Sequence, residues 1–132
     1  MSDLMLAWLV TEVDPAEARV PDGFVLRGDR LIEPLLPRVT DQGTSIAVYF
    51  EVHDLTATVR IEAVMTPVEQ RDQTTVSVAF VEDVPGGMWA RDIILDLDGV
   101  KPGAYHLTVR VTDIPGNLRV LERSTTLEIL SR

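Results

Sequence analysis

A turn followed by an alternating segment fills residues 97–113, which have the sequence Leu97-Asp-Gly-Val-Lys-Pro-Gly-Ala-Tyr-His-Leu-Thr-Val-Arg-Val-Thr-Asp113. From Tyr105 onward, apolar residues occupy every second position, and mostly polar residues occupy the positions between them. This period of two is typical of a strand with one buried face. Pro102 and Gly103 are turn formers, so they predict a corner immediately before the strand.

Tyr105 opens this strand directly after the turn. A tyrosine in that position can bury its ring and donate its hydroxyl hydrogen to a backbone carbonyl a few residues upstream. This arrangement, the tyrosine corner, is a hallmark of immunoglobulin-like sandwiches. We therefore predict that Tyr105 pins a connection between two sheets.

Similar segments rich in Val, Ile and Thr recur along the chain between Gly- and Pro-containing turns, which favours an all-β protein. A short helix is the alternative for residues 4–10, because a short apolar run fits either element. Tight turns are expected at Gly28-Asp29 and at residues 114–117. The segments expected to form strands are residues 4–10, 24–26, 31–32, 45–53, 58–68, 74–81, 89–97, 105–113 and 118–130.

This spacing predicts an all-β fold, an immunoglobulin- or fibronectin-III-like antiparallel β-sandwich of about eight strands. Residues 1–132 are expected to form a single domain, which has been excised from, or is appended to, a larger protein. The segments near Leu4 and Phe24 are the expected edges of the sheets.

The composition restricts the classes of function. The chain has 132 residues, with 12 Lys and Arg against 21 Asp and Glu, and a net charge of −9. Such acidity disfavours nucleic acid and anionic membrane surfaces as partners, since both are negatively charged. Cysteine is absent, so no disulfide and no thiolate metal site can form. The apolar run at residues 4–10 is too short for membrane insertion.

Two parts of the sequence resemble a β-sandwich module that is appended to bacterial GWxTD-motif proteins. The first comprises Ser2-Asp-Leu-Met-Leu-Ala7 and Gly43-Thr-Ser-Ile-Ala-Val-Tyr-Phe-Glu-Val-His-Asp-Leu55. The second is the pattern Pro-Gly-x-Tyr-x-Leu-x-Val-x-Val-x-Asp from Pro102 to Asp113. The Gly-Trp-x-Thr-Asp motif itself is missing, so the chain is similar to the appended sandwich alone. The resemblance implies no catalytic residue, and it suggests an extracytoplasmic parent protein of the envelope or a secreted one.

Few residues in the sequence indicate catalysis or metal binding. The two histidines, His53 and His106, are expected on polar strand faces without a nucleophile or further metal ligands. The tripeptide Arg27-Gly28-Asp29 matches an integrin-recognition sequence, but its Gly-Asp pair also suits a hairpin turn. We therefore predict that the chain is not an enzyme and that it holds no cofactor and no metal.

Five carboxylates are candidate calcium ligands at one end of the sandwich, because calcium prefers several oxygen ligands on loop ends. Ordinary turn chemistry is the alternative that we favour, since Asp is a common turn former. The five are Glu82, Asp83, Asp96, Asp98 and Asp113.

Tyr49, Trp89 and Ile94 are the candidates for an interaction surface. Tyr49 lies on the strand face opposite the expected core, and Ile94 stands on an otherwise polar face. The sequence thus predicts a non-catalytic protein-interaction or spacer module that binds a protein partner or forms a weak homodimer through an edge strand. The alternative is a carbohydrate-binding module in which exposed Tyr49 and Trp89 stack on sugar rings. Packing of these rings in the core or at an edge is the other interpretation.

Overall fold

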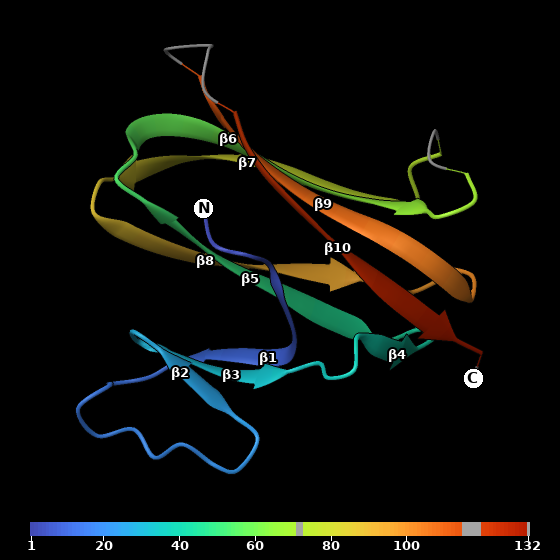
Figure 1. Ribbon diagram of the computed structural model, residues 1–132, viewed down its shortest axis with the longest axis horizontal. Helices are drawn as coiled ribbons and strands as arrows, with labels where there is room; N and C mark the ends of the chain where they lie inside the picture. Colours follow the sequence, from blue (N-terminus) through green and yellow to red (C-terminus); the bar gives the residue numbers. More distant parts are fainter. Residues whose placement is uncertain (71–72, 115–119, 132) are drawn as a thin grey trace.

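Two five-stranded sheets pack face to face in the computed structural model (Figure 1). The structure describes residues 1–70, 73–114 and 120–131, and every regular element within these ranges is a strand. The all-β sandwich is therefore confirmed, and its two layers are consistent with an immunoglobulin- or fibronectin-III-like fold. The strands are β1 (Met5–Glu12), β2 (Val25–Arg27), β3 (Arg30–Pro34), β4 (Val39–Asp41), β5 (Ser45–His53), β6 (Thr56–Pro67), β7 (Val76–Pro85), β8 (Met88–Asp96), β9 (Gly103–Asp113) and β10 (Val120–Leu130).

The first sheet has the strand order β2-β3-β1-β5-β8, and the second has the order β4-β10-β9-β6-β7. Neighbouring strands are antiparallel except β4 and β10, which run parallel. Among the described strands, β2, β8, β4 and β7 therefore end the two sheets. The prediction of an edge near Phe24 is confirmed by β2. The prediction of an edge near Leu4 is wrong, because β1 lies between β3 and β5.

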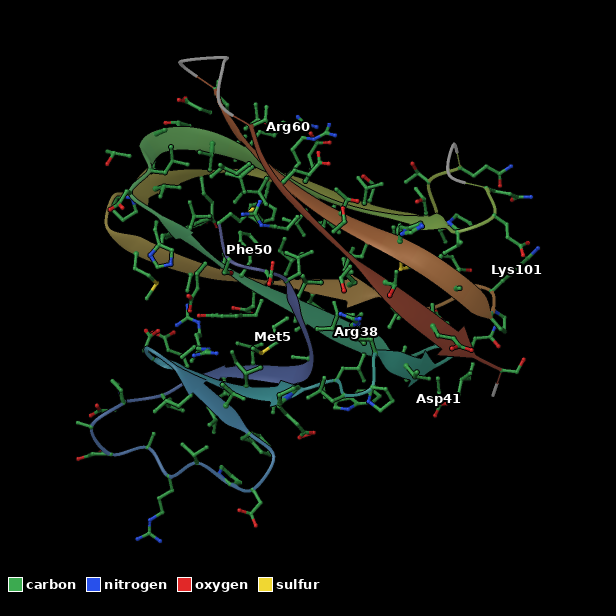
Figure 2. All side chains as sticks on the ribbon, in the orientation of Figure 1. Met5, Arg38, Asp41, Phe50, Arg60 and Lys101 are labelled. Carbon is green, nitrogen blue, oxygen red and sulfur yellow. The ribbon has the colours of Figure 1, made fainter. Side chains whose placement is uncertain are left out.

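The main core lies between the two sheets and is built from alternate residues of the long strands. Phe50 is fully buried there, and its ring meets the Trp89 ring edge-on with 6.1 Å between centroids. Figure 2 shows Phe50 on β5 between the two layers. Each large aliphatic residue buried in this way contributes roughly 1.5–3 kcal/mol. The residues of β9 that take part are Tyr105, Leu107, Val109 and Val111.

The predicted tyrosine corner is present at the start of β9. The Tyr105 side chain is buried, and its hydroxyl donates a hydrogen bond of 2.5 Å to the Lys101 carbonyl oxygen. Gly103, between these two residues, has a φ of +150°, a conformation that favours glycine. The turn formers identified in the sequence thus place the ring in the core and its hydroxyl on the backbone.

Strand β1 changes partner halfway along its length. Met5, Leu6 and Ala7 pair with β5, whereas the residues from Leu9 onward pair with β3. The register shifts between Ala7 and Leu9, and an irregularity of this kind bends a strand. The predicted strand at residues 4–10 is confirmed, and the helical alternative is wrong.

Residues 8–34, which we name the N-terminal hook, fold back over the outer face of β5 and β8. The Arg30 guanidinium of β3 lies 3.7 Å from the Asp92 carboxylate of β8, although β1 and β5 separate these strands in the sheet order. A Cβ atom added to Gly28 would lie 3.6 Å from the terminal methyl carbon of Met88. In Figure 1 the hook is the blue and cyan part of the chain, below β5.

The hook creates a second, smaller core on the outer side of β5. Its four buried residues are Ala7, Ile32, Ala47 and Tyr49. As a result, residues 46–50 of β5 are buried on both faces of the strand. Sequence periodicity placed Tyr49 on the strand face opposite the expected core, but it could not show that the hook covers that face.

The expected turns have different outcomes. Gly28 and Asp29 form the two-residue connection between β2 and β3, as predicted, and Gly28 has a φ of +56°. The turn expected at residues 114–117 lies outside the described residues except for Ile114. Strand β4, which has three residues, was missed. The residues that the structure describes include no helical segment with the length and the apolar character of a membrane span.

Candidate binding surfaces

The three predicted surface residues lie in different environments. Tyr49 has only 3% of its surface exposed, whereas Ile94 on the edge strand β8 is 60% exposed. Trp89 is half-buried, and it packs on the main core through Phe50. Tyr49 is therefore not an exposed aromatic, because the N-terminal hook covers its ring. Packing of the two rings, which was the other interpretation of these residues, is therefore what the structure shows, and Tyr49 and Trp89 do not form the sugar-stacking platform of the alternative.

The Tyr49 hydroxyl takes part in a polar contact at the rim of the small core. It donates a hydrogen bond of 2.6 Å to Oε2 of Glu51, whose Oε1 lies 3.7 Å from Nε2 of His53. Burial raises the pKa of Tyr49 far above its usual value. The hydrogen bond to Glu51 and the negative charge of the Glu51 carboxylate raise this pKa further. Tyr49 therefore stays protonated at neutral pH and acts as a hydrogen-bond donor.

The tripeptide Arg27-Gly28-Asp29 lies at the tip of the hairpin between β2 and β3. Oδ1 of Asp29 is 3.0 Å from a guanidinium nitrogen of Arg30, and the Asp29 carbonyl oxygen accepts a hydrogen bond from the Val13 amide. These contacts tie the tip to the rest of the hook, which is the structural role expected of a tight turn.

Three of the five candidate calcium ligands already have hydrogen-bond or ion-pair partners within the chain. Asp96 accepts a hydrogen bond from the Asp98 amide at 2.9 Å, and Asp83 accepts one from the Thr58 hydroxyl at 2.6 Å. Glu82 lies 2.7 Å from the Arg91 guanidinium. In the part of the chain that the structure describes, no three His, Asp or Glu side chains are grouped to hold a metal ion.

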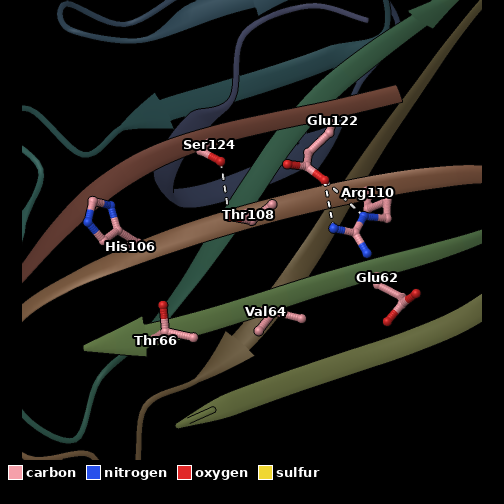
Figure 3. A pocket seen from close by; sticks show the side chains of 8 residues that line it. All are labelled: Glu62, Val64, Thr66, His106, Thr108, Arg110, Glu122 and Ser124. Atoms are coloured by element: carbon pink, nitrogen blue, oxygen red, sulfur yellow. Dashed lines mark hydrogen bonds and ion pairs between the residues drawn. The ribbon is translucent and has the colours of Figure 1, made fainter. Parts of the chain in front are cut away.

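An open groove of about 610 Å³ crosses the outer face of the second sheet (Figure 3). Arg110 contacts Oε2 of Glu122 through two nitrogens, at 2.9 and 2.8 Å, and the Thr108 and Ser124 hydroxyls are 3.0 Å apart. Sequence reasoning missed this groove because it depends on the register of three strands. The groove is lined by Glu62, Val64 and Thr66 of β6, His106, Thr108 and Arg110 of β9, and Glu122 and Ser124 of β10.

The edge strands differ in length and charge. Strands β2 and β4 have three residues each, whereas β8 has nine and β7 has ten. Strand β8 carries Arg91, Asp92 and Asp96. In β7, by contrast, residues 76–81 have the sequence Val-Ser-Val-Ala-Phe-Val, without a charged residue. We name residues 76–81 the β7 edge run.

The side chains of the β7 edge run alternate between the two faces of the sheet. Val76, Val78 and Phe80 are only partly buried, and they pack against the margin of the main core. Ser77, Ala79 and Val81 are exposed on the other face. Among the described residues, the apolar side chains at the β7 margin of the main core are thus less buried than those at the centre of the core.

No protein-family model matches the chain, and no curated protein is similar to it in sequence. The resemblance to the module of GWxTD-motif proteins therefore stays a prediction. The surfaces described above are the basis for a functional proposal.

Proposed function

We propose that the chain is a non-catalytic protein-interaction module that binds an extended segment as an additional strand beside β7. The supporting observation is the length and the composition of this edge. An edge strand presents unpaired backbone N–H and C=O groups, and natural sheets usually protect long edges with charges, prolines or bulges. The β7 edge run contains neither a charged residue nor a proline.

The other edges are poorer docking sites. Strands β2 and β4 are too short to align more than three residues of a partner. The charges of Arg91, Asp92 and Asp96 interrupt β8, although Ile94 between them is exposed. In strand addition, backbone hydrogen bonds supply affinity and alternate side chains supply specificity. A partner of β7 would therefore present apolar residues toward Val76, Val78 and Phe80.

Binding of a synthetic strand to the complete chain tests this proposal. The probe is a fluorescein-labelled peptide with the sequence of residues 74–83, followed by fluorescence anisotropy. Ala79→Lys places a charge on the exposed face at the middle of the edge run, so we expect it to weaken binding at least tenfold. Ala104→Lys is the matched control, because Ala104 is exposed on β9, an inner strand of the same sheet. No binding, or an equal loss in both variants, would contradict the proposal.

A neutral oligosaccharide in the groove of Figure 3 is the second candidate function. The charges of the groove are paired within the chain, Arg110 with Glu122 and Arg60 with Glu62 at 3.2 Å. The hydroxyl groups of the lining can both donate and accept hydrogen bonds, as the hydroxyls of a sugar do. This candidate keeps the carbohydrate-binding alternative but moves it away from Tyr49, which is buried.

The test of this second candidate is an NMR titration of the chain with maltohexaose and cellohexaose. Binding would shift the amide signals of the groove residues in the wild type. Thr108→Val removes one hydroxyl and should reduce these shifts, whereas Thr11→Val on the first sheet should leave them unchanged. An absence of shifts with either sugar would contradict oligosaccharide binding by this groove.

A further inference from the structure

We propose that the segment added beside β7 is β7 of a second copy of the chain, in an antiparallel pair about a two-fold axis. This inference rests on the proposed function and names the partner. The second sheets of the two copies, with five strands each, would join into one continuous sheet.

The contacts of the neighbouring acidic residues favour an uncharged partner over a basic one. Glu82 and Asp83 follow the edge run directly, and they are the charged residues of β7. Glu82 already pairs with Arg91 at 2.7 Å, and Asp83 already accepts the hydrogen bond of Thr58 at 2.6 Å. The cations of a basic segment would have to compete with Arg91 and Thr58 for these carboxylates. The edge run of a second copy carries no charged residue, so it can pair with β7 without breaking these contacts.

The position of the acidic residues at one end of the strand also sets the direction of pairing. A parallel pair in register would place Glu82 beside Glu82 of the second copy, and like charges in neighbouring positions destabilise a sheet. An antiparallel pair centred on Val78 places Glu82 opposite Thr74, and one centred on Ala79 places it opposite Val76. Both arrangements separate the carboxylates of two chains that each carry a net charge of −9.

The alternation of side chains restricts the centre of the pair further. Residues that face each other across two antiparallel strands must lie on the same side of the sheet. The two-fold axis therefore lies midway between the two copies of one and the same residue, and not midway between two successive residue pairs. With Val78 at the centre, Val76 of each copy faces Phe80 of the other. Aromatic and β-branched cross-strand pairs stabilise sheets. This pair would add to the cover of side chains that are only partly buried at the core margin, where the Arg91 guanidinium already lies over the Phe80 ring, 5.1 Å from its centroid.

Cysteine cross-linking tests the arrangement directly, because the chain has no cysteine of its own. Val78→Cys and Ala79→Cys each place a thiol at one of the two allowed centres. Val81→Cys is the control on the same strand, and its Cα atoms would lie roughly 13–20 Å apart along the strands in these registers. A disulfide requires Cα atoms about 4.4–6.8 Å apart.

We expect oxidation to link one of the two central variants at least tenfold faster than Val81→Cys. Light scattering of the unmodified chain should show twice the monomer mass at high concentration, and Ala79→Lys should restore the monomer whereas Ala104→Lys should not. These scattering measurements decide the question if Val78→Cys does not fold. Equal cross-linking at all three positions, or a monomer at every concentration, would overturn self-pairing. If a monomeric chain still binds the peptide of residues 74–83, self-pairing fails and strand addition at β7 stands; loss of both overturns both.

Discussion

Tyr105 places a large ring in the core while its hydroxyl group stays bonded to the backbone. Replacing it by phenylalanine keeps the ring and leaves the Lys101 carbonyl oxygen without this donor. We expect Tyr105→Phe to lower the free energy of unfolding by about 1 kcal/mol, the net contribution of one hydrogen bond. Urea denaturation measures the change. An unchanged midpoint would show that the corner hydrogen bond does not stabilise the fold.

The two tyrosines also predict how stability depends on pH. Burial raises the pKa of both Tyr49 and Tyr105 above the ordinary value of about 10. Above that pH the unfolded chain loses phenol protons that the folded chain keeps, so the free energy of unfolding falls as pH rises. Below about pH 10 this contribution is fully present. Urea denaturation at increasing alkaline pH should show the fall, and Tyr49→Phe should reduce its slope more than Tyr105→Phe.

The connection between β7 and β8 contains two glycines with different surroundings. A Cβ atom on Gly86, at a φ of +93°, would lie 2.6 Å from the Thr56 hydroxyl oxygen, whereas one on Gly87, at +65°, would meet no atom within 4 Å. We expect Gly87→Ala to cost about 1 kcal/mol from backbone strain alone, and Gly86→Ala to cost more. Thr56→Ala should recover part of the additional loss. Equal unfolding free energies for the two glycine variants would contradict this account.

The long strands were predictable from sequence because their side chains alternate with a period of two over many residues. Strand β5 matches its predicted bounds, Ser45–His53, and β9 begins at the turn that Pro102 and Gly103 form. The period does not specify which strands become neighbours. The central position of β1, the cover over Tyr49 and the edge position of β7 depend on contacts between segments far apart in the chain, so they required the structure.

The candidate surfaces were less predictable for the same reason. Ile94 is exposed, as its polar neighbours on β8 indicated, whereas Tyr49 is buried by a hairpin that its own strand gives no sign of. The β7 edge run lies within residues 74–81, which the sequence predicted as a strand. Its lack of charge became informative only when the sheet order placed it at an edge.

The net charge of the molecule predicts how salt affects self-association. Two chains that each carry −9 repel each other, and dissolved ions screen that repulsion. Pairing of two uncharged edge runs should therefore become tighter as the salt concentration rises. Sedimentation equilibrium at increasing sodium chloride concentrations measures the dissociation constant. A dimer that weakened in salt would depend on ion pairs between the copies and would contradict the β7 arrangement.

The bend in β1 separates the hook from the rest of the sandwich, and we expect these two parts to open at different free-energy costs. The four buried residues of the smaller core anchor the hook, whereas β6 and β9 are anchored by the main core. Amide protons of β2 and β3 should thus exchange with deuterium by partial opening, well before those of β6 and β9, which need global unfolding. While the hook is detached, the Tyr49 ring would meet water, so its fluorescence should become accessible to small quenchers without loss of the sandwich.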